Sequence, residues 1–383
     1  MEKMNKVRAV ELFAGIGGFR LAADRLNIET VWANDIDPTA SLVYRDNFGS
    51  NVFVEGDINS YIDFIPDHDI LTGGFPCQPF SKAGKKQGID DYRGTLFEAI
   101  VKIVRIKKPN YFVLENVNSL LYMENGRHFR TILYALSSLD YKIEWRVLNA
   151  TSFGLPQNRE RVIIVGSKNQ KTNQSYFLDQ NEFLSIPTKT LDAIARFNTW
   201  KDISQSKGKF SDWGMAYQGK FISFDIPLPV YSHQKKLKDI LQSDVDASFD
   251  FTADTLLRIE KSQYVNKYYN GVQILYNQAG GARMGYSIFG IDGVAPTLTA
   301  STSRHYERYC IGTAYRRLTN VEYARIQGFP DNHCKATSPY NQYKLYGNAV
   351  PPQMIEFVLY RIINNLYTEI EKQEFTLFDL WEE

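Results

Sequence analysis

The chain has little cysteine and histidine, almost no net charge, and no long apolar run. Its 383 residues include three cysteines and five histidines, and its formal net charge is +1. Three cysteines do not make a disulfide framework, and with these histidines they offer too few ligands for a closed zinc site. No apolar run reaches membrane-spanning length, and the first residues lack the apolar core of a signal peptide. We therefore expect a cytoplasmic protein that holds no metal.

The near-zero net charge also restricts the partners. It argues against a uniformly basic surface that coats nucleic acid, but it permits local basic faces. A hydrophobic content of 44% with 23% charged residues is typical of a globular protein. A chain of this length can bury a large core and is expected to form two domains.

The most distinctive stretch is Gly73-Gly74-Phe75-Pro76-Cys77, which follows a buried strand expected at residues 69–72. Glycine lets a backbone approach closely, and proline stiffens the chain around the thiol. A thiol held rigidly at the end of a strand suits a nucleophile. An isolated Pro-Cys pair is more often a small buried packing residue, so the rest of the chain has to decide.

Near the N-terminus, residues 7–13 predict a buried strand. A glycine turn at 13–18 follows the strand, and a helix follows the turn. This succession is typical of the nucleotide-binding turn of a doubly wound sheet. Asp35 ends the next strand about 20 residues after the turn, where a ribose diol would be held. Asp57 ends a third strand and could accept a hydrogen bond from an adenine amino group, with Ile58 packed on the base. A turn or cap role fits Asp57 equally well.

Two further strand ends carry charged residues. The strand expected at 111–114 ends at Glu115, and Arg159 and Arg161 precede a strand at 162–165. The carboxyl end of a strand beside Cys77 is where this architecture places active sites. The polar segment 82–88 is either an active-site loop or an ordinary solvated loop.

The character of the sequence changes after residue 167. From 168 to about 293 it is polar and aromatic-rich without regular strand and helix alternation, which predicts a second, loop-rich domain. Basic residues there could bind phosphate, although an ordinary surface helix or loop is an equal alternative. Thr319 and Glu322 then predict a capping box on a helix at 320–327. A final helix with apolar residues every four positions is expected to pack back on the first domain.

Seven motifs in chain order resemble those of DNA (cytosine-5) methyltransferases of the bacterial restriction–modification kind. They are Phe13-Ala14-Gly15-Ile16-Gly17-Gly18, Gly74-Phe75-Pro76-Cys77-Gln78, Arg93-Gly94-Thr95-Leu96-Phe97, Glu115-Asn116-Val117, Gln157-Asn158-Arg159-Glu160-Arg161, Arg325-Ile326-Gln327-Gly328-Phe329-Pro330 and Gly347-Asn348-Ala349-Val350. The resemblance covers residues 7–167 and 294–366. Residues 168–290 match no motif, as expected for the region that sets sequence specificity in this family.

The resemblance implies an α/β fold with two domains. A Rossmann-like S-adenosylmethionine-dependent methyltransferase domain would comprise residues 1–167 and 294–383, and a smaller, loop-rich target-recognition domain residues 168–293. The implied partner is double-stranded DNA, from which a cytosine is flipped before methylation. It further implies a monomer on the bacterial nucleoid, with a cognate restriction endonuclease in the same system and no metal.

The resemblance also implies roles for single residues. Cys77 would add to cytosine C6, Glu115 would bind N3, and Arg161 would stabilise O2. The implied catalytic residues are Cys77, Glu115, Arg161, Arg159 and Asn116. The implied cofactor-binding residues are Phe13, Gly15, Ile16, Gly17, Gly18, Asp35, Ile36, Asp57, Ile58, Gly74, Pro76, Asn348 and Ala349. The implied DNA-binding residues are Ser81, Lys82, Lys85, Lys86, Gln87 and Thr297. Outside the motifs, the basic residues Lys235, Lys236 and Arg283 are further candidates for DNA contacts.

Other functions stay open on the sequence. The glycine turn and Asp35 alone would also fit a nicotinamide dehydrogenase, which leaves the cysteine and Glu-Asn-Val motifs unexplained. A tRNA cytosine-5 methyltransferase on the same scaffold is a nearer alternative, and a cytosine-binding protein without activity is a third. Asp35 stands where the family often has glutamate, so Asp37 is an alternative for the ribose contact.

Overall fold

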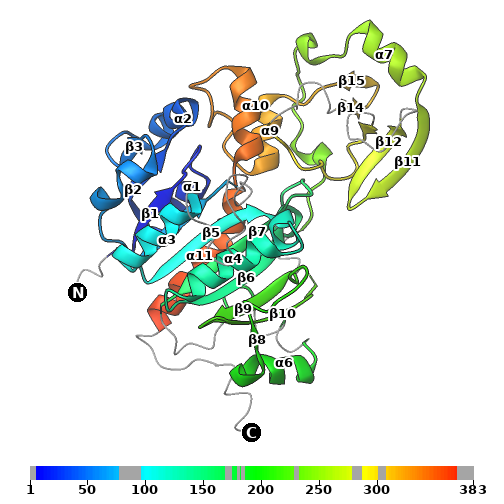
Figure 1. Cartoon of the computed structure of the whole chain (residues 1–383). Coiled ribbons are helices and arrows are strands. Elements are labelled where there is room, and N and C mark those ends of the chain that lie inside the picture. Colours follow the sequence, from blue (N-terminus) through cyan, green and yellow to red (C-terminus); the bar gives the residue numbers. More distant parts are fainter. Residues whose placement is uncertain are drawn as a thin grey trace.

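A computed structural model describes residues 6–76, 96–168, 175–178, 182, 186–227, 233–277, 287–300 and 308–368 (Figure 1). Its largest element is a ten-stranded sheet with the order β3-β2-β1-β4-β5-β7-β6-β9-β10-β8. The strands are β1 (Arg8–Leu12), β2 (Glu29–Asp35), β3 (Phe53–Glu55), β4 (Ile70–Gly74), β5 (Tyr111–Val117), β6 (Lys142–Asn149), β7 (Glu160–Ser167), β8 (Lys201–Asp202), β9 (Trp213–Tyr217) and β10 (Lys220–Phe224). The first five are parallel, and β7 lies antiparallel between β5 and β6.

Helices cover both faces of this sheet. They are α1 (Gly18–Arg25), α2 (Pro38–Phe48), α3 (Leu96–Lys107), α4 (Arg127–Ser137) and α11 (Pro352–Thr368). Because side chains alternate along a strand, Phe112 and Ile164 pack in the core with α3 and α4, whereas Val113 and Val165 pack with α1 and α11. The doubly wound architecture predicted from the sequence is confirmed, and α11 packs against α1.

A five-stranded sheet forms a smaller lobe, at the upper right of Figure 1. Its strands are β11 (Gln263–Tyr269), β12 (Val272–Asn277), β13 (Ser287–Phe289), β14 (Arg308–Ile311) and β15 (Ala314–Arg316). The other helices are α6 (Thr188–Ala195), α7 (Ala253–Glu260), α9 (Asn320–Gln327) and α10 (Pro339–Asn348). Short 3₁₀ helices are η1 (Ile58–Ser60), η2 (Ile62–Phe64), η4 (Asn118–Leu121), η5 (Ala150–Phe153), η6 (Phe197–Thr199), η7 (Leu237–Ile240) and η8 (Ala247–Phe249).

The sheet pairing departs from the predicted domain boundaries at 168 and 294. β9 pairs with β6, so residues 213–224 extend the large sheet, and β14 and β15 lie beyond 294 yet complete the small one. The expectation of an irregular segment is therefore wrong for these strands. Gln218 and Gly219 both have positive φ, which is typical of a two-residue hairpin turn between β9 and β10. Gln-Gly is a weaker hairpin signal than Asn-Gly, and the strands it joins are short.

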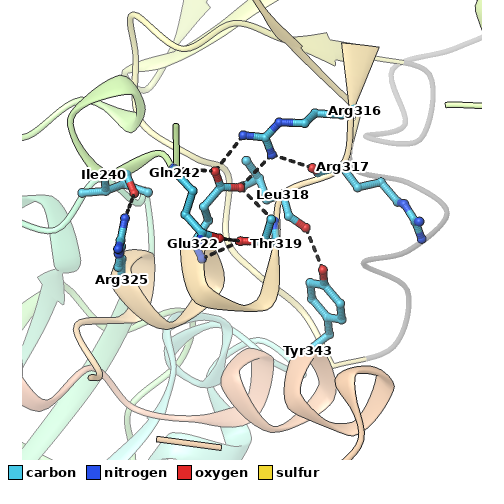
Figure 2. A network of polar contacts seen from close by, with 9 residues as sticks. All are labelled: Ile240, Gln242, Arg316, Arg317, Leu318, Thr319, Glu322, Arg325 and Tyr343. Carbon is cyan, nitrogen blue, oxygen red and sulfur yellow. Dashed lines mark hydrogen bonds and ion pairs between the residues drawn. The ribbon is translucent and has the colours of Figure 1, made fainter. Parts of the chain in front are cut away.

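One buried carboxylate ties the small lobe to helix α9 (Figure 2). Glu322 accepts hydrogen bonds from both terminal nitrogens of Arg316, at 2.7 and 2.8 Å, and from the backbone amides of Gln242 and Thr319. The predicted capping box between Thr319 and Glu322 is confirmed. All four bonds converge on one side chain, so the segment after η7, the end of β15 and the start of α9 are held together.

Candidate active site

A cavity of about 440 Å³ opens where the parallel strands end. It is lined by the carboxyl ends of β1, β2, β4 and β5 with the residues that follow them, by the starts of α1, α2 and α3, by Arg161, and by the end of α10 with the residues after it. The lining residues are Phe13, Ala14, Gly15, Ile16, Gly18, Phe19, Asp35, Ile36, Asp37, Ala40, Gly74, Phe75, Pro76, Leu96, Glu115, Asn116, Val117, Arg161, Leu345, Gly347, Asn348, Ala349 and Val350. Most of the residues that the motifs single out for cofactor and base are thus brought to one space.

Asp35 holds the glycine turn in place. One of its carboxylate oxygens accepts from the amide of Gly15 at 2.7 Å, and the other accepts from the amide of Asp37 at 2.8 Å. Burial raises the pKa of Asp35, and the two backbone hydrogen bonds oppose that shift. Ile36, at the rim of the cavity, is 67% exposed. A carboxylate that can accept further hydrogen bonds and a large exposed apolar side chain therefore stand side by side at the cavity.

Helix α1 begins unusually close to the wall after α10. A Cβ at Gly18 would lie 2.5 Å from the carbonyl oxygen of Val350, a distance that real Cβ atoms do not show. Gly17 has φ +83°, a conformation that glycine adopts freely. The glycines of this turn are therefore required by close approach and by backbone conformation, and they let residues 347–350 close the cavity.

Glu115 and Arg161 form an ion pair inside the cavity. The Nε of Arg161 lies 2.7 Å from Oε1 of Glu115, and the two side chains are 12% and 13% exposed respectively. Strands β5 and β7 pair antiparallel and bring the two residues together, with Arg161 opposite Val117. A carboxylate and a guanidinium so placed can bind the polar edge of a planar heterocycle.

Asn116 fixes the chain next to this pair. Its amide nitrogen donates to the carbonyl of Phe75 at 2.9 Å, and its oxygen accepts from the amide of Val117. The side chain is buried. Asn116 thus anchors the segment that leads through Pro76 to the next residue, Cys77.

Several predicted site residues lie outside the described part of the chain. They are Cys77, Ser81, Lys82, Lys85, Lys86, Gln87 and Arg283. Their assignments stay predictions.

Asp57, Ile58 and Gly17 are described but do not line the cavity. Asp57 is exposed and caps η1, where its carboxylate accepts from the amide of Asn59 at 3.0 Å. Ile58 is buried in the core under the sheet. The cap role that the sequence allowed for Asp57 is present, and its contact with adenine remains a prediction.

Arg159 does not reach the cavity either. Its guanidinium is fully buried and donates to the carbonyls of Leu298, Gly347 and Ala349 at 2.9, 3.0 and 2.8 Å. The predicted catalytic contact is not what the structure shows. Arg159 and Arg161 are two residues apart in the sequence, but in the fold they have different partners: Arg159 binds backbone carbonyls and Arg161 binds Glu115.

The predicted DNA contacts that are described lie apart from this pocket. Thr297 is partly exposed, and its hydroxyl donates to the carbonyl of Asn158 at 2.6 Å. Lys235 and Lys236 are exposed just before η7. Lys238 is paired with Asp292 at 2.8 Å.

The described residues contain no helix that is long and apolar enough to cross a membrane. Nor do their histidine, cysteine, aspartate and glutamate side chains gather anywhere as a group that could hold a metal ion.

Comparison with solved structures shows the same fold elsewhere. The Dnmt2 methyltransferase of S. pombe aligns with a TM-score of 0.63 and 19% identity, covering 96% of this chain and all of that one. A methyltransferase of Entamoeba histolytica gives a TM-score of 0.62 at 18% identity, covering 95% and 99% of the two chains. At such identities the likeness concerns the fold alone.

Sequence comparison goes further. Type II methyltransferase M1.ScrFI of Lactococcus lactis subsp. cremoris is 34% identical over 95% of this chain and 80% of its own length. Type II methyltransferase M.HhaI of Haemophilus parahaemolyticus is 30% identical over 95% and 97%. The model of the C-5 cytosine-specific DNA methylases matches residues 7–364. With its glycine turn, Glu115 and Arg161 around one cavity, the chain belongs to the family of C-5 cytosine-specific DNA methylases.

Proposed function

We propose that this DNA cytosine-5 methyltransferase takes its methyl group from S-adenosylmethionine and acts on a cytosine flipped out of a specific duplex sequence. One observation carries the proposal: a single cavity joins the glycine turn and Asp35 to the Glu115–Arg161 pair and to the chain that enters Cys77. A nicotinamide dehydrogenase would not account for the Glu115–Arg161 pair or for the cysteine motif beside it.

The cavity suits the proposed methyl donor. Its volume of about 440 Å³ is within the range of small-molecule sites. The oxygens of Asp35 keep lone pairs beyond their backbone hydrogen bonds and can accept from the two ribose hydroxyls. Ile36 would cover the base, and residues 347–349 would close the site from the other side. When bound, S-adenosylmethionine supplies an electrophilic methyl group.

The protein's own groups would prepare the cytosine. The thiolate of Cys77 adds to C6, because cysteine is a strong nucleophile even when mostly protonated. This addition makes C5 nucleophilic. Glu115 in its protonated form donates a hydrogen bond to N3 and Arg161 donates to O2, where negative charge develops. Once C5 is methylated, its proton passes to solvent or a nearby base, the C5–C6 double bond re-forms, and the Cys77 thiolate leaves. Glu115 and Arg161 lie too deep for a stacked base, which is why the base must be flipped.

We further propose the biological setting from the relatives. M1.ScrFI and M.HhaI are Type II methyltransferases, so this chain would protect host DNA from a cognate restriction endonuclease. It would act as a monomer on the bacterial nucleoid in the cytoplasm. Residues 168–293 would contribute target recognition. The likeness to Dnmt2 concerns the fold and does not favour tRNA as the substrate.

Expression in a methylation-free bacterial host, followed by bisulfite sequencing, tests the proposal. We expect 5-methylcytosine at one short recurrent sequence, and none when Cys77→Ala is expressed at the same level. Cys310→Ala, which changes a cysteine of the small lobe, is the matched control and should retain methylation. Methylated tRNA with an unmethylated genome would establish the alternative substrate. Methylation that survives Cys77→Ala would remove the proposed nucleophile.

A further inference from the structure

We propose that Arg159 is a positioning residue, which fixes the cofactor wall and the predicted DNA-contact segment to the strand that carries Arg161. The inference rests on the function proposed above and assigns a different task to the first arginine of the Gln-Asn-Arg-Glu-Arg motif. Arg161 faces the cavity, whereas Arg159 acts through the backbone around it.

The hydrogen-bond partners of the Arg159 guanidinium are backbone carbonyls. Among the described residues, its guanidinium donates hydrogen bonds to the carbonyls of Leu298, Gly347 and Ala349, and the side chain is 0% exposed. Two of the acceptors, Gly347 and Ala349, lie at the end of α10, where the helix leaves its last carbonyls without partners. A cation is favoured at this negative end of the helix. The charge of Arg159 is therefore used to hold a helix terminus.

The third acceptor belongs to another segment. Leu298 follows Thr297, and its amide donates to the side chain of Gln157, two residues before Arg159. The two segments also touch directly, because a Cβ at Gly347 would lie 2.4 Å from the backbone of Thr299. One guanidinium thus bridges chain stretches that are about 50 residues apart and meet at close range.

Residues 158–161, where β7 begins, contact three parts of the proposed site. Gly347, Asn348 and Ala349 line the cavity where the methyl donor is proposed to bind. Thr297 is bonded through its hydroxyl to the carbonyl of Asn158. Arg161 pairs with Glu115. Removing the Arg159 guanidinium would free the wall and the Thr297 segment while leaving the Glu115–Arg161 pair in place.

The test separates binding from chemistry. In Arg159→Met the stem length is kept and the donors are lost. We expect the dissociation constant for S-adenosylhomocysteine, measured by calorimetry without DNA, to rise about tenfold or more. The KM values for S-adenosylmethionine and DNA should rise similarly, with kcat at saturation within about threefold of wild type. Arg159→Lys keeps the charge and some of the donors, so it should recover part of the affinity.

Arg161→Met, two residues along the same strand, is the matched control with the opposite pattern. We expect its kcat to fall by about 10²-fold with an unchanged dissociation constant for S-adenosylhomocysteine. Thermal unfolding reports whether each variant is folded, and Arg159→Lys carries the test if the methionine variant is not.

The possible results are distinct. An Arg159→Met enzyme with unchanged affinities and a kcat lowered about 10²-fold would make Arg159 catalytic and overturn the inference. Unchanged affinities and unchanged kcat would overturn it as well. A wild-type enzyme that binds S-adenosylhomocysteine but methylates no DNA would contradict the proposed function, while the calorimetric comparison would still decide the role of Arg159. Failure of the wild type to bind S-adenosylhomocysteine would end both proposals.

Discussion

The Nε atom of Arg161 lies 2.7 Å from Oε1 of Glu115, on neighbouring strands of the large sheet. The other oxygen of this carboxylate has room because residue 74, opposite Glu115 on β4, is glycine. A Cβ there would lie 3.1 Å from Oε2. The guanidinium of Arg161 thus holds one oxygen of the Glu115 carboxylate, and the absence of a side chain at Gly74 leaves space for the other.

Glu115→Gln keeps the size of the side chain and removes its charge and its capacity to transfer a proton. We expect kcat to fall by about 10²–10⁴-fold, the range for loss of a positioned acid or base. Single-turnover methyl transfer to duplex DNA measures the effect. Binding of S-adenosylhomocysteine should be unchanged, and a loss of less than about threefold would remove Glu115 from the chemistry.

Asp35→Asn tests the ribose contact. Asparagine keeps one acceptor oxygen but loses the charge that strengthens the hydrogen bonds. We expect affinity for S-adenosylmethionine to fall by about 1.5–3 kcal/mol, the worth of a hydrogen bond to a charged group. Calorimetry gives the cofactor affinity, and a DNA-binding assay should show no change. An unaltered cofactor affinity would move the ribose contact elsewhere, with Asp37 as the first candidate.

The buried carboxyl of Glu11, on β1, should make the free energy of unfolding depend on pH. It is buried, accepts a hydrogen bond from the hydroxyl of Tyr44 at 2.9 Å, and burial raises its pKa from 4.5 to about 8. The folded state therefore keeps a proton that the unfolded state releases above pH 4.5. The contribution of Glu11 is complete below pH 4.5 and is lost as the pH rises to about 8, with a slope of about 1.4 kcal/mol per pH unit.

Glu11→Gln removes this titration. Urea unfolding at pH 6 and pH 8 should show that the wild type loses up to about 2–3 kcal/mol between the two values and that the variant loses less. Glu29→Gln, on the exposed start of β2, should follow the wild type. Parallel losses in the wild type and Glu11→Gln would show that Glu11 does not titrate in this range.

Glu322→Gln tests the joint between the lobes. The substitution leaves Arg316 buried without a full counter-charge, and breaking a buried pair costs about 3–5 kcal/mol. Glu356→Gln, which breaks the exposed pair of Glu356 with Arg25, should cost no more than about 1 kcal/mol. Urea unfolding measures both. Equal costs for the two variants would mean that the Glu322 network does not stabilise the joint.

Lys235→Ala with Lys236→Ala tests the predicted phosphate contacts. Both lysines are exposed, and we expect the double variant to bind all duplexes more weakly and with a lower salt dependence, by about one unit of slope for each contact. Lys238→Ala is the comparison, because Lys238 is held by Asp292 and should have a smaller effect. Fluorescence anisotropy at several salt concentrations gives the slopes. A weakening confined to one DNA sequence would assign the two lysines to base recognition instead.

Features that depend on residues close together in the chain could be predicted from the sequence. The strand, glycine turn and helix at 8–25 follow from local pattern, and so do the cap of α9 by Thr319 and Glu322 and the apolar face of the last helix. Asp35 and Glu115 were placed at strand ends, and parallel strands bring such ends to one edge. These predictions rest on local periodicity and on the rule that parallel strands end at one edge of a sheet.

Contacts between side chains far apart in the chain could not be predicted and became visible only in the folded protein. Arg159 and Arg161 share a motif, yet one binds the carbonyls after α10 and the other binds Glu115. The pairing of β9 with β6 and the ion pair of Arg316 with Glu322 are further cases. Local sequence patterns do not predict such contacts. A buried charge needs partners, but the fold determines which groups lie near enough to pair with it. An edge strand has unpaired backbone groups, and the fold likewise determines which strand pairs with it.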